Sequence, residues 1–191
     1  ALHWTALDPE AVDLGLLRMD QARSVRDGIA VVTRAGAPPS NVLLADDEGH
    51  IAWTYMGKIP VRRGLDGSVS LSWADGRTGW NGYIPPDELP RSIDPPSGFL
   101  VSANQRMTDE TYPHVIGHAF AGGYRAFRIT ERLRAMERIR EQDLMTVQLD
   151  TTTQLYDFYR ELLQRLLSVE VIAQRKELAD ARQAVDAWNG R

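Results

Sequence analysis

Residues Ser40 to Arg63 have the sequence SNVLLADDEGHIAWTYMGKIPVRR. Two short apolar runs, Val42–Ala45 and Ile51–Tyr55, flank the acidic, glycine-containing turn Asp46–Gly49. Apolar runs on either side of such a turn are typical of a β-hairpin whose loop has about four or five residues. The stretch therefore predicts a hairpin over residues 41–56, and it is the most informative part of the chain.

Two polar side chains are expected at the open end of this hairpin. Asn41 begins the first strand, and Arg62 follows the second strand after Gly57 and Pro60. Because an antiparallel ribbon returns the chain to the level at which it started, Asn41 and Arg62 are predicted to lie near one another and to face a common cleft. Their N–H groups would suit an oxyanion or a carboxylate. Two simpler interpretations stay open: an Asx-turn residue for Asn41 and a surface arginine for Arg62.

The composition excludes several classes of protein. The chain has 191 residues, of which 43% are hydrophobic, with a net charge of −4 and no cysteine. This length is enough for a domain with its own core, and the mildly acidic balance gives no indication of nucleic-acid binding. No apolar run approaches the roughly 18 residues that span a membrane. The lack of cysteine excludes disulfides, thiol catalysis and cysteine-bound metal in these residues.

The N-terminal part, residues 1–123, is predicted to be mixed. Asp8-Pro9-Glu10 is typical of a helix start, with aspartate as the cap and proline at the first helical position. Apolar residues then recur at helical spacing, which predicts two helices with a break at Gly15. These residues are Leu14, Leu17, Ala22, Val25, Ile29 and Val32. Residues 64–96 are rich in glycine, proline and tryptophan, which predicts a long ordered loop. The apolar run 98–103 predicts a short buried strand.

The C-terminal part, residues 124–191, is predicted to be mostly helical. Three stretches in it have apolar residues at spacings of three and four, which is the helical pattern. They lie within residues 129–139, 151–171 and 177–188. Arg125 and Arg128 stand where this part begins.

No metal site is predicted. His114 and His118 are four residues apart and could share one face of a helix. However, Pro113 and Gly117 weaken a helix there, and no third ligand is evident. The sequence also has no G-x-S-x-G elbow, P-loop or H-E-x-x-H motif.

Four aromatic residues, Trp53, Tyr55, Trp73 and Trp80, could form one aromatic face. Packing of a long loop onto the core is the simpler interpretation. The aromatic face leads to a second hypothesis for the whole chain. On this hypothesis the chain is a non-catalytic binding module that uses its tryptophan- and glycine-rich loop to bind a sugar or a peptide.

Several further blocks follow the hairpin in a fixed order. They are W-x-G-Y-I-P at Trp80–Pro85, D-P-P-S-G-F-L-V-S-A-N at Asp94–Asn104, Tyr112-Pro113, and R-A-F-R-I at Arg125–Ile129. With the hairpin, their order and spacing resemble the penicillin acylase family of N-terminal nucleophile hydrolases over roughly residues 2–167. The resemblance implies an α+β fold. The chain would form a portion of the family's αββα sandwich of antiparallel strands and helices, with a mostly helical C-terminal half. The same resemblance implies that Arg125 and Arg128, in the last block, form buried ion pairs.

The resemblance also implies an activity. Such enzymes hydrolyse linear amides, of the penicillin or N-acyl homoserine lactone type, through an N-terminal serine and an acyl-enzyme. This chain begins with Ala1, which has no nucleophilic atom, and Leu2–Ala6 resembles a block well inside the family's catalytic chain. The chain is therefore expected to be a fragment of the catalytic β chain, truncated at its C-terminus. Without the nucleophile it should be inactive by itself.

Residue roles are carried over from the resemblance. Asn41 matches the asparagine whose side-chain amide stabilises the oxyanion, and Arg62 matches an active-site arginine. Asn104 matches an asparagine in an A-N-N or A-N-W block, but here the block continues as Gln105-Arg106. Because of this departure, Asn104 is expected to have a structural or supporting role behind the site.

Cofactors and partners are likewise implied only by the resemblance. No cofactor is expected in this chain, although family members often carry a structural calcium whose ligands would lie mostly outside it. The expected partners are a small acyl amide, the remainder of the catalytic chain and the small α chain of the same precursor. Neither nucleic acid nor a membrane span is expected. Exposed sheet edges could also pair two copies of the fragment. A periplasmic or secreted location follows from the family and not from these residues.

Overall fold

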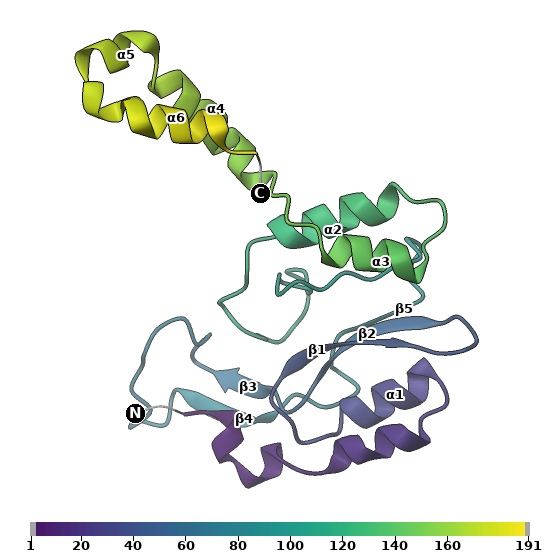
Figure 1. Ribbon diagram of the computed structural model, residues 1–191. Helices are drawn as coiled ribbons and strands as arrows, with labels where there is room; N and C mark the ends of the chain where they lie inside the picture. The colour runs from purple at the N-terminus through teal and green to yellow at the C-terminus, as the bar shows by residue number, and fades with distance from the viewer. Residues whose placement is uncertain (1–2, 190–191) are drawn as a thin grey trace. The chain divides into compact units, whose positions relative to one another are not determined.

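Strands and helices share the first of two units in the computed structural model, and helices alone form the second (Figure 1). The units comprise Ala1–Ala121 and Gly122–Arg191, and the structure describes residues 3–189 of the chain. Within those residues, every helix is too short or too polar to cross a bilayer.

The predicted hairpin is present. β1 (Ser40–Ala45) pairs antiparallel with β2 (Ile51–Met56), in a register that places Asn41 opposite Tyr55. β5 (Arg91–Ile93) pairs with the other side of β2, so the strand order in this sheet is β1-β2-β5. β2 is therefore the central strand, and the register fixes which side chains share each face.

Asp46 closes the hairpin turn and joins it to a helix. Its backbone N–H donates to the His50 carbonyl at 3.1 Å, and its Oδ1 accepts from the His50 N–H at 2.9 Å. The second oxygen, Oδ2, accepts from the N–H of Val25 at 3.1 Å. Val25 is the first residue of α1 (Val25–Val32). One carboxylate thus satisfies a free N–H at a helix start as well as its own turn.

Each face of β2 is covered by a different layer. Ala52 packs with Val25 and Ile29 of α1, the helix that runs along the sheet in Figure 1. Trp53 and Tyr55 point the other way and form a second cluster, which we call the main cluster; its other buried members are Ile59, Ile84 and Leu89. Because successive side chains of a strand alternate between faces, every interior residue of β2 is buried.

A second, two-stranded sheet corrects the expectation of a continuous loop over residues 64–96. β3 (Pro60–Arg63) pairs antiparallel with β4 (Gly79–Tyr83), with a bulge or irregular step between Pro60 and Arg62. β4 and β5 both lie in the stretch that composition assigned to a loop. Short strands of this kind depend on a neighbouring backbone for their hydrogen bonds, and that partner is not visible in local composition.

The buried strand predicted over residues 98–103 is not formed. These residues run without strand pairing, and Gln105 bonds to their backbone instead. Its Oε1 accepts from the N–H of Ala103 at 2.7 Å, and its Nε2 donates to the Val101 carbonyl at 3.0 Å. A side-chain amide here takes the hydrogen bonds that a strand would have made.

The helices predicted near the N-terminus are mostly short 3₁₀ segments. Asp8 does cap one of them, η2 (Pro9–Ala11), by accepting from the Glu10 N–H at 3.0 Å. η1 (Thr5–Leu7) precedes it and η3 (Gly15–Gln21) follows. The apolar stripe was wrong at its start, since Leu14 and Leu17 are 79% and 66% exposed. Regular α-helix begins only at α1, where Ser24 accepts from the Asp27 N–H at 3.1 Å.

The second unit is helical, as predicted, with different boundaries. Its elements are α2 (Tyr124–Arg134), α3 (Glu141–Gln148), α4 (Leu155–Leu166), α5 (Val169–Gln174), η4 (Lys176–Leu178) and α6 (Ala179–Ala187). The helix expected over 151–171 is interrupted at Ser168, which caps α5 by accepting from the Val171 N–H. Arg182 of α6 donates to the carbonyls of Gln164 and Leu167 at 3.0 and 2.8 Å, at the end of α4. A cation there satisfies carbonyls that have no partner within the helix.

Asp150 joins α2 to the chain that follows α3. Its Oδ2 accepts from Arg128 Nε at 2.8 Å and from Arg132 Nη1 at 3.1 Å, and its Oδ1 accepts from the Thr152 N–H at 2.9 Å. The Thr152 bond and the Arg128 guanidinium, acting against the effect of burial, lower the pKa of Asp150 to about 2. Arg128 thus forms the expected ion pair, whereas Arg125 is exposed.

We expect Asp150→Asn to destabilise the chain by about 1.5–3 kcal/mol at neutral pH, because it removes hydrogen bonds to a buried charge. The folded pKa lies below the ordinary value of 3.8. The stabilisation is therefore present above about pH 4 and is lost as the pH falls through about 2. Urea unfolding should show a difference in the free energy of unfolding between the parent and the variant, and this difference should become smaller as the pH is lowered across this range. Glu161→Gln, an exposed change in α4 of the same unit, should leave the midpoint unchanged; an equal loss in both variants would contradict the assignment.

Candidate functional site

Asn41 lies in β1 and its side chain is fixed by a tryptophan. Its Oδ1 accepts a hydrogen bond from Nε1 of Trp53 at 2.8 Å. Asn41 stands directly opposite Tyr55, so Trp53 is its diagonal neighbour on the same face of the sheet. Diagonal pairs are within reach of large aromatic side chains. The Asx-turn interpretation is therefore wrong, because the amide oxygen bonds to a side chain on the next strand and not to the local backbone.

Arg62 lies in β3, opposite Trp80, and is partly buried. Its Nη1 donates to the carbonyls of Val115 and Ile116, at 2.5 and 3.5 Å. Burial lowers the pKa of the Arg62 guanidinium, and the nearby Asp66 carboxylate opposes that change. A surface arginine is a better description of Arg63, whose Nη2 donates to the Gly76 carbonyl at 2.8 Å from an exposed position.

The side chains of Asn41 and Arg62 have separate partners, and no hydrogen bond joins them in the described residues 3–189. What connects their surroundings is the main cluster. Trp53 belongs to it, and Val61 and Ile116 pack against it. Trp53, which binds Asn41, is thus in the same cluster against which Val61 and Ile116 pack. Val61 precedes Arg62 in the chain, and Ile116 has one of the carbonyls to which Arg62 donates. That both side chains face one cleft stays a prediction.

A polar cavity of about 310 Å³ lies beside the loop that Arg62 contacts. Its lining includes Val115 and Ile116 together with charged and imidazole side chains: Asp66, Arg106, Asp109, Glu110, His114 and His118. None of Asn41, Arg62 and Asn104 is among the residues that line this cavity. Cavities of about 730 and 490 Å³ lie in the second unit, and one of about 540 Å³ lies beside α1 and the hairpin turn; none of the three predicted residues lines these either. The link between the polar cavity and the predicted site is the Val115–Ile116 backbone, to which Arg62 donates.

Two of the histidines, His50 and His114, are each bound to a carboxylate. His50 Nδ1 lies 2.8 Å from Asp94 Oδ2, and this hydrogen bond raises the pKa of His50. His114 Nε2 lies 2.6 Å from Glu88 Oε2. The segment from His114 to His118 is not helical, so these two residues do not share a helix face. Within residues 3–189, no group of three or more His, Asp or Glu side chains is arranged to bind a metal.

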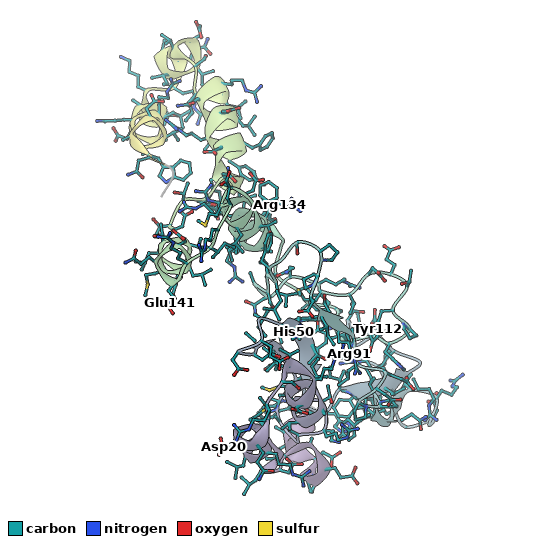
Figure 2. All side chains as sticks on the ribbon, turned by 90° about the vertical axis from the view of Figure 1, so that its right-hand side faces the viewer. Asp20, His50, Arg91, Tyr112, Arg134 and Glu141 are labelled. Carbon is teal, nitrogen blue, oxygen red and sulfur yellow. The ribbon has the colours of Figure 1, made fainter. Side chains whose placement is uncertain are left out.

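Arg91 and Tyr112, both labelled with His50 in Figure 2, support the segment before β5. Arg91 Nη2 donates to the carbonyls of Pro86 and Asp87 at 2.7 and 3.0 Å, and the Tyr112 hydroxyl donates to the Glu88 carbonyl at 3.0 Å. Burial, followed by the charge of Glu88, raises the pKa of Tyr112 to about 12. These side chains fix the backbone of residues 86–88.

The aromatic residues do not form one face. Trp53 and Tyr55 are in the main cluster, with ring centroids 5.2 Å apart in an edge-on arrangement. Trp80 instead stacks on His3 at 3.8 Å, and Trp73 lies 4.9 Å from the same imidazole. The sequence showed the aromatic residues but not this division, which depends on tertiary contacts: Trp53 and Tyr55 lie in β2, Trp80 lies in β4, and Trp73 lies outside the strands.

Asn104 is an exposed turn residue with φ of +65°. Its carbonyl accepts from the Ala121 N–H at 2.9 Å. Asparagine is one of the few non-glycine residues that adopt this left-handed backbone readily. The turn alone therefore explains an asparagine here, and a role behind the site stays a prediction.

Comparisons with known proteins agree on one family. The model of the penicillin amidase family matches residues 1–191. Penicillin acylase 2 proenzyme of Pseudomonas sp. (strain SE83) is 30% identical over 176 residues, which are 92% of this chain and 22% of that protein. Acyl-homoserine lactone acylase QuiP of Pseudomonas aeruginosa is 28% identical over 139 residues, 73% of this chain and 16% of that protein. The chain thus spans about a fifth of the length of these relatives.

The fold is also similar to that of a solved acylase. Thermostable penicillin G acylase from Alcaligenes faecalis superposes with a TM-score of 0.69, over 96% of this chain and 33% of that one. The sequence identity is 20%, so this likeness concerns the fold alone. It confirms the predicted fold class, a portion of the N-terminal nucleophile hydrolase sandwich with antiparallel strands and helices.

We expect Arg62→Met to loosen the loop at residues 113–118, because it removes the guanidinium donor to the Val115 and Ile116 carbonyls. Hydrogen–deuterium exchange in that loop should become about tenfold faster, which corresponds to one charge-assisted hydrogen bond. Arg63→Met is the matched control, since Arg63 contacts Gly76 instead. It should affect exchange near residue 76 only. Unchanged exchange at 113–118 in the Arg62 variant would show that these contacts do not order the loop.

Proposed function

Because the chain belongs to the penicillin amidase family, we propose that it is part of an amide hydrolase that removes an acyl group from a linear amide. Its relatives are acylases, named for penicillin and for acyl-homoserine lactones. The substrate class we propose is an acyl amide of one of these two types. A serine would attack the amide carbonyl and expel the amine, and water would then release the acid from the acyl-enzyme.

The observation that carries this proposal is the setting of the Asn41 amide. Attack on an amide carbonyl places negative charge on its oxygen, and fixed N–H donors stabilise that charge more in the transition state than in the bound substrate. Asn41 lies on a strand that is paired with the buried central strand, and its oxygen is already engaged by Trp53. We infer that its N–H₂ group is the oxyanion donor.

Arg62 has a complementary role in this proposal. Its guanidinium is partly buried and fixed by two backbone carbonyls, so its positive charge has a defined position. Such a charge is less screened than one on the surface. We infer that Arg62 stabilises negative charge in the site and helps to order the loop over residues 115–116.

The nucleophile is proposed to come from outside these 191 residues. In the part of the chain that the structure describes, the serine and threonine hydroxyls that donate a defined hydrogen bond donate to a carboxylate or a backbone carbonyl, and none donates to a histidine. Ala1 lies outside the described residues. We propose that another part of the same precursor supplies an N-terminal serine, and that the site is complete only in that assembly.

The remaining partner and location assignments are also proposals. The outer edge of β1 is unpaired within the described residues, and we propose that it pairs with the remainder of the precursor rather than with a second copy. A structural calcium, as the family implies, would need ligands outside the described residues, and no step here depends on one. A periplasmic or secreted location rests on the family alone. The binding-module hypothesis has no support, since the acylase family matches the whole chain.

We expect Asn41→Ala in the complete enzyme to lower kcat by about 10²–10³-fold with little change in KM, because the amide acts on charge that develops only in the transition state. Steady-state kinetics on chromogenic phenylacetyl and long-chain acyl anilides measure both constants. Asn81→Ala, an exposed amide in β4, serves as the control and should retain full kcat. A kcat for Asn41→Ala within threefold of the parent would refute the oxyanion role.

The 191-residue chain alone should not hydrolyse amides, because it has no cysteine and no serine or threonine hydroxyl that donates to a histidine among residues 3–189. The purified chain can be incubated with the same two anilides. The expected result is turnover no faster than buffer. Activity that co-elutes with the protein through repeated chromatography would instead place a complete catalytic site in these residues.

A further inference from the structure

We propose that Trp53 is a positioning residue for the Asn41 amide: it fixes which end of the carboxamide faces the reacting carbonyl. The inference rests on the proposed function, in which Asn41 is the oxyanion donor. It adds to that function a residue that does not touch the substrate. The juxtaposition that carries it is the bond from Trp53 Nε1 to Asn41 Oδ1, 2.8 Å long, at the edge of the main cluster.

The chemistry of the two groups determines the orientation of the amide. An indole N–H can only donate, whereas a carboxamide has an acceptor end and a donor end. If the amide were turned by half a rotation, two donors would face each other and the Trp53 N–H would lose its acceptor. Trp53 is only 4% exposed, so water is poorly placed to replace that acceptor. A buried donor without an acceptor is unfavourable, so the turned amide is disfavoured.

Trp53 is itself immobilised on three sides. Its backbone lies in the central strand, opposite Leu43 of β1 and Ser92 of β5. Its ring meets Tyr55 edge-on, with 71° between the ring planes. The indole thus takes its position from the sheet and the main cluster, and Asn41 takes its orientation from the indole.

The orientation of the Asn41 amide decides whether it stabilises or destabilises the oxyanion. With Oδ1 engaged by Trp53, the two Nδ2 hydrogens point away from the indole, and no protein acceptor binds them among residues 3–189. They are available for a developing oxyanion. A turned amide would present its oxygen to that negative charge and would raise the barrier instead of lowering it. Trp53 therefore acts on kcat through Asn41, with no expected effect on substrate affinity.

The first test is Trp53→Phe in the complete enzyme, which keeps an aromatic ring in the main cluster and removes only the N–H donor and the second ring. We expect kcat to fall by about 10–100-fold, as for misplacement of a catalytic group, while KM stays within threefold. Trp73→Phe is the matched control, because Trp73 lies near His3 and outside the main cluster. It should keep the parental kcat.

A double-mutant cycle then separates positioning from packing. Asn41→Ala, Trp53→Phe and the double variant are compared with the parent. If Trp53 acts through Asn41, Trp53→Phe has no further effect on kcat once Asn41 is alanine. An equal loss in both backgrounds would overturn the positioning role. If Asn41→Ala itself leaves kcat unchanged, the proposed oxyanion function fails first, and the two failures are thus distinguishable.

A spectroscopic measurement keeps the test valid if Trp53→Phe does not fold. Nuclear magnetic resonance of indole N–H protons, in the parent and in Asn41→Ala, needs no change at Trp53. One indole proton should be slow to exchange in the parent, and it should shift upfield and exchange faster when Asn41 is replaced. Identical indole spectra in the two proteins would show that the bond does not exist in solution and would overturn the proposal.

Discussion

A strand that is covered on both faces needs a hydrogen-bond partner for each polar side-chain atom that it buries. All four interior residues of β2 are buried in this way. Its alternate residues pack on α1 and on the main cluster, while β1 and β5 satisfy its backbone. Because Trp53 has to be buried, its single polar atom needs an acceptor, and Asn41 is the acceptor within reach. The candidate oxyanion donor is thus positioned by the same requirement that forms the core.

The sequence predicted the features that depend on local pattern. The hairpin follows from two apolar runs around an acidic turn, and the helices of the second unit follow from spacings of three and four. Features that depend on a distant partner were missed. β4 and β5 became strands only because β3 and β2 offered backbone hydrogen bonds, and residues 98–103 stayed unpaired because no strand did. Helix breaks such as the one at Ser168 depend on a capping hydroxyl rather than on hydrophobic period.

The candidate site shows the same division. Asn41 was identified through a family resemblance, and strand geometry placed it at the open end of the hairpin. Its bond to Trp53 could in principle have been found from the sequence, since the hairpin register makes the two residues diagonal neighbours on one face. The contacts of Arg62 could not, because Val115 and Ile116 lie more than fifty residues further along the chain, in a segment without periodic structure.

The irregular step between Pro60 and Arg62 bears on how this segment can evolve. Neighbouring residues of a strand project to opposite faces, so the loss of one residue there would move Arg63 into the place of Arg62, whereas the gain of one residue would move Val61 there. Because residues 62 and 63 are both arginines, a loss would leave a guanidinium at this place, but a gain would put an apolar side chain there. Point substitutions around them can accumulate gradually, but a one-residue insertion would displace the partly buried guanidinium of Arg62 in a single step. We therefore expect the number of residues between the hairpin and Arg62 to be more tightly constrained than the identity of those residues.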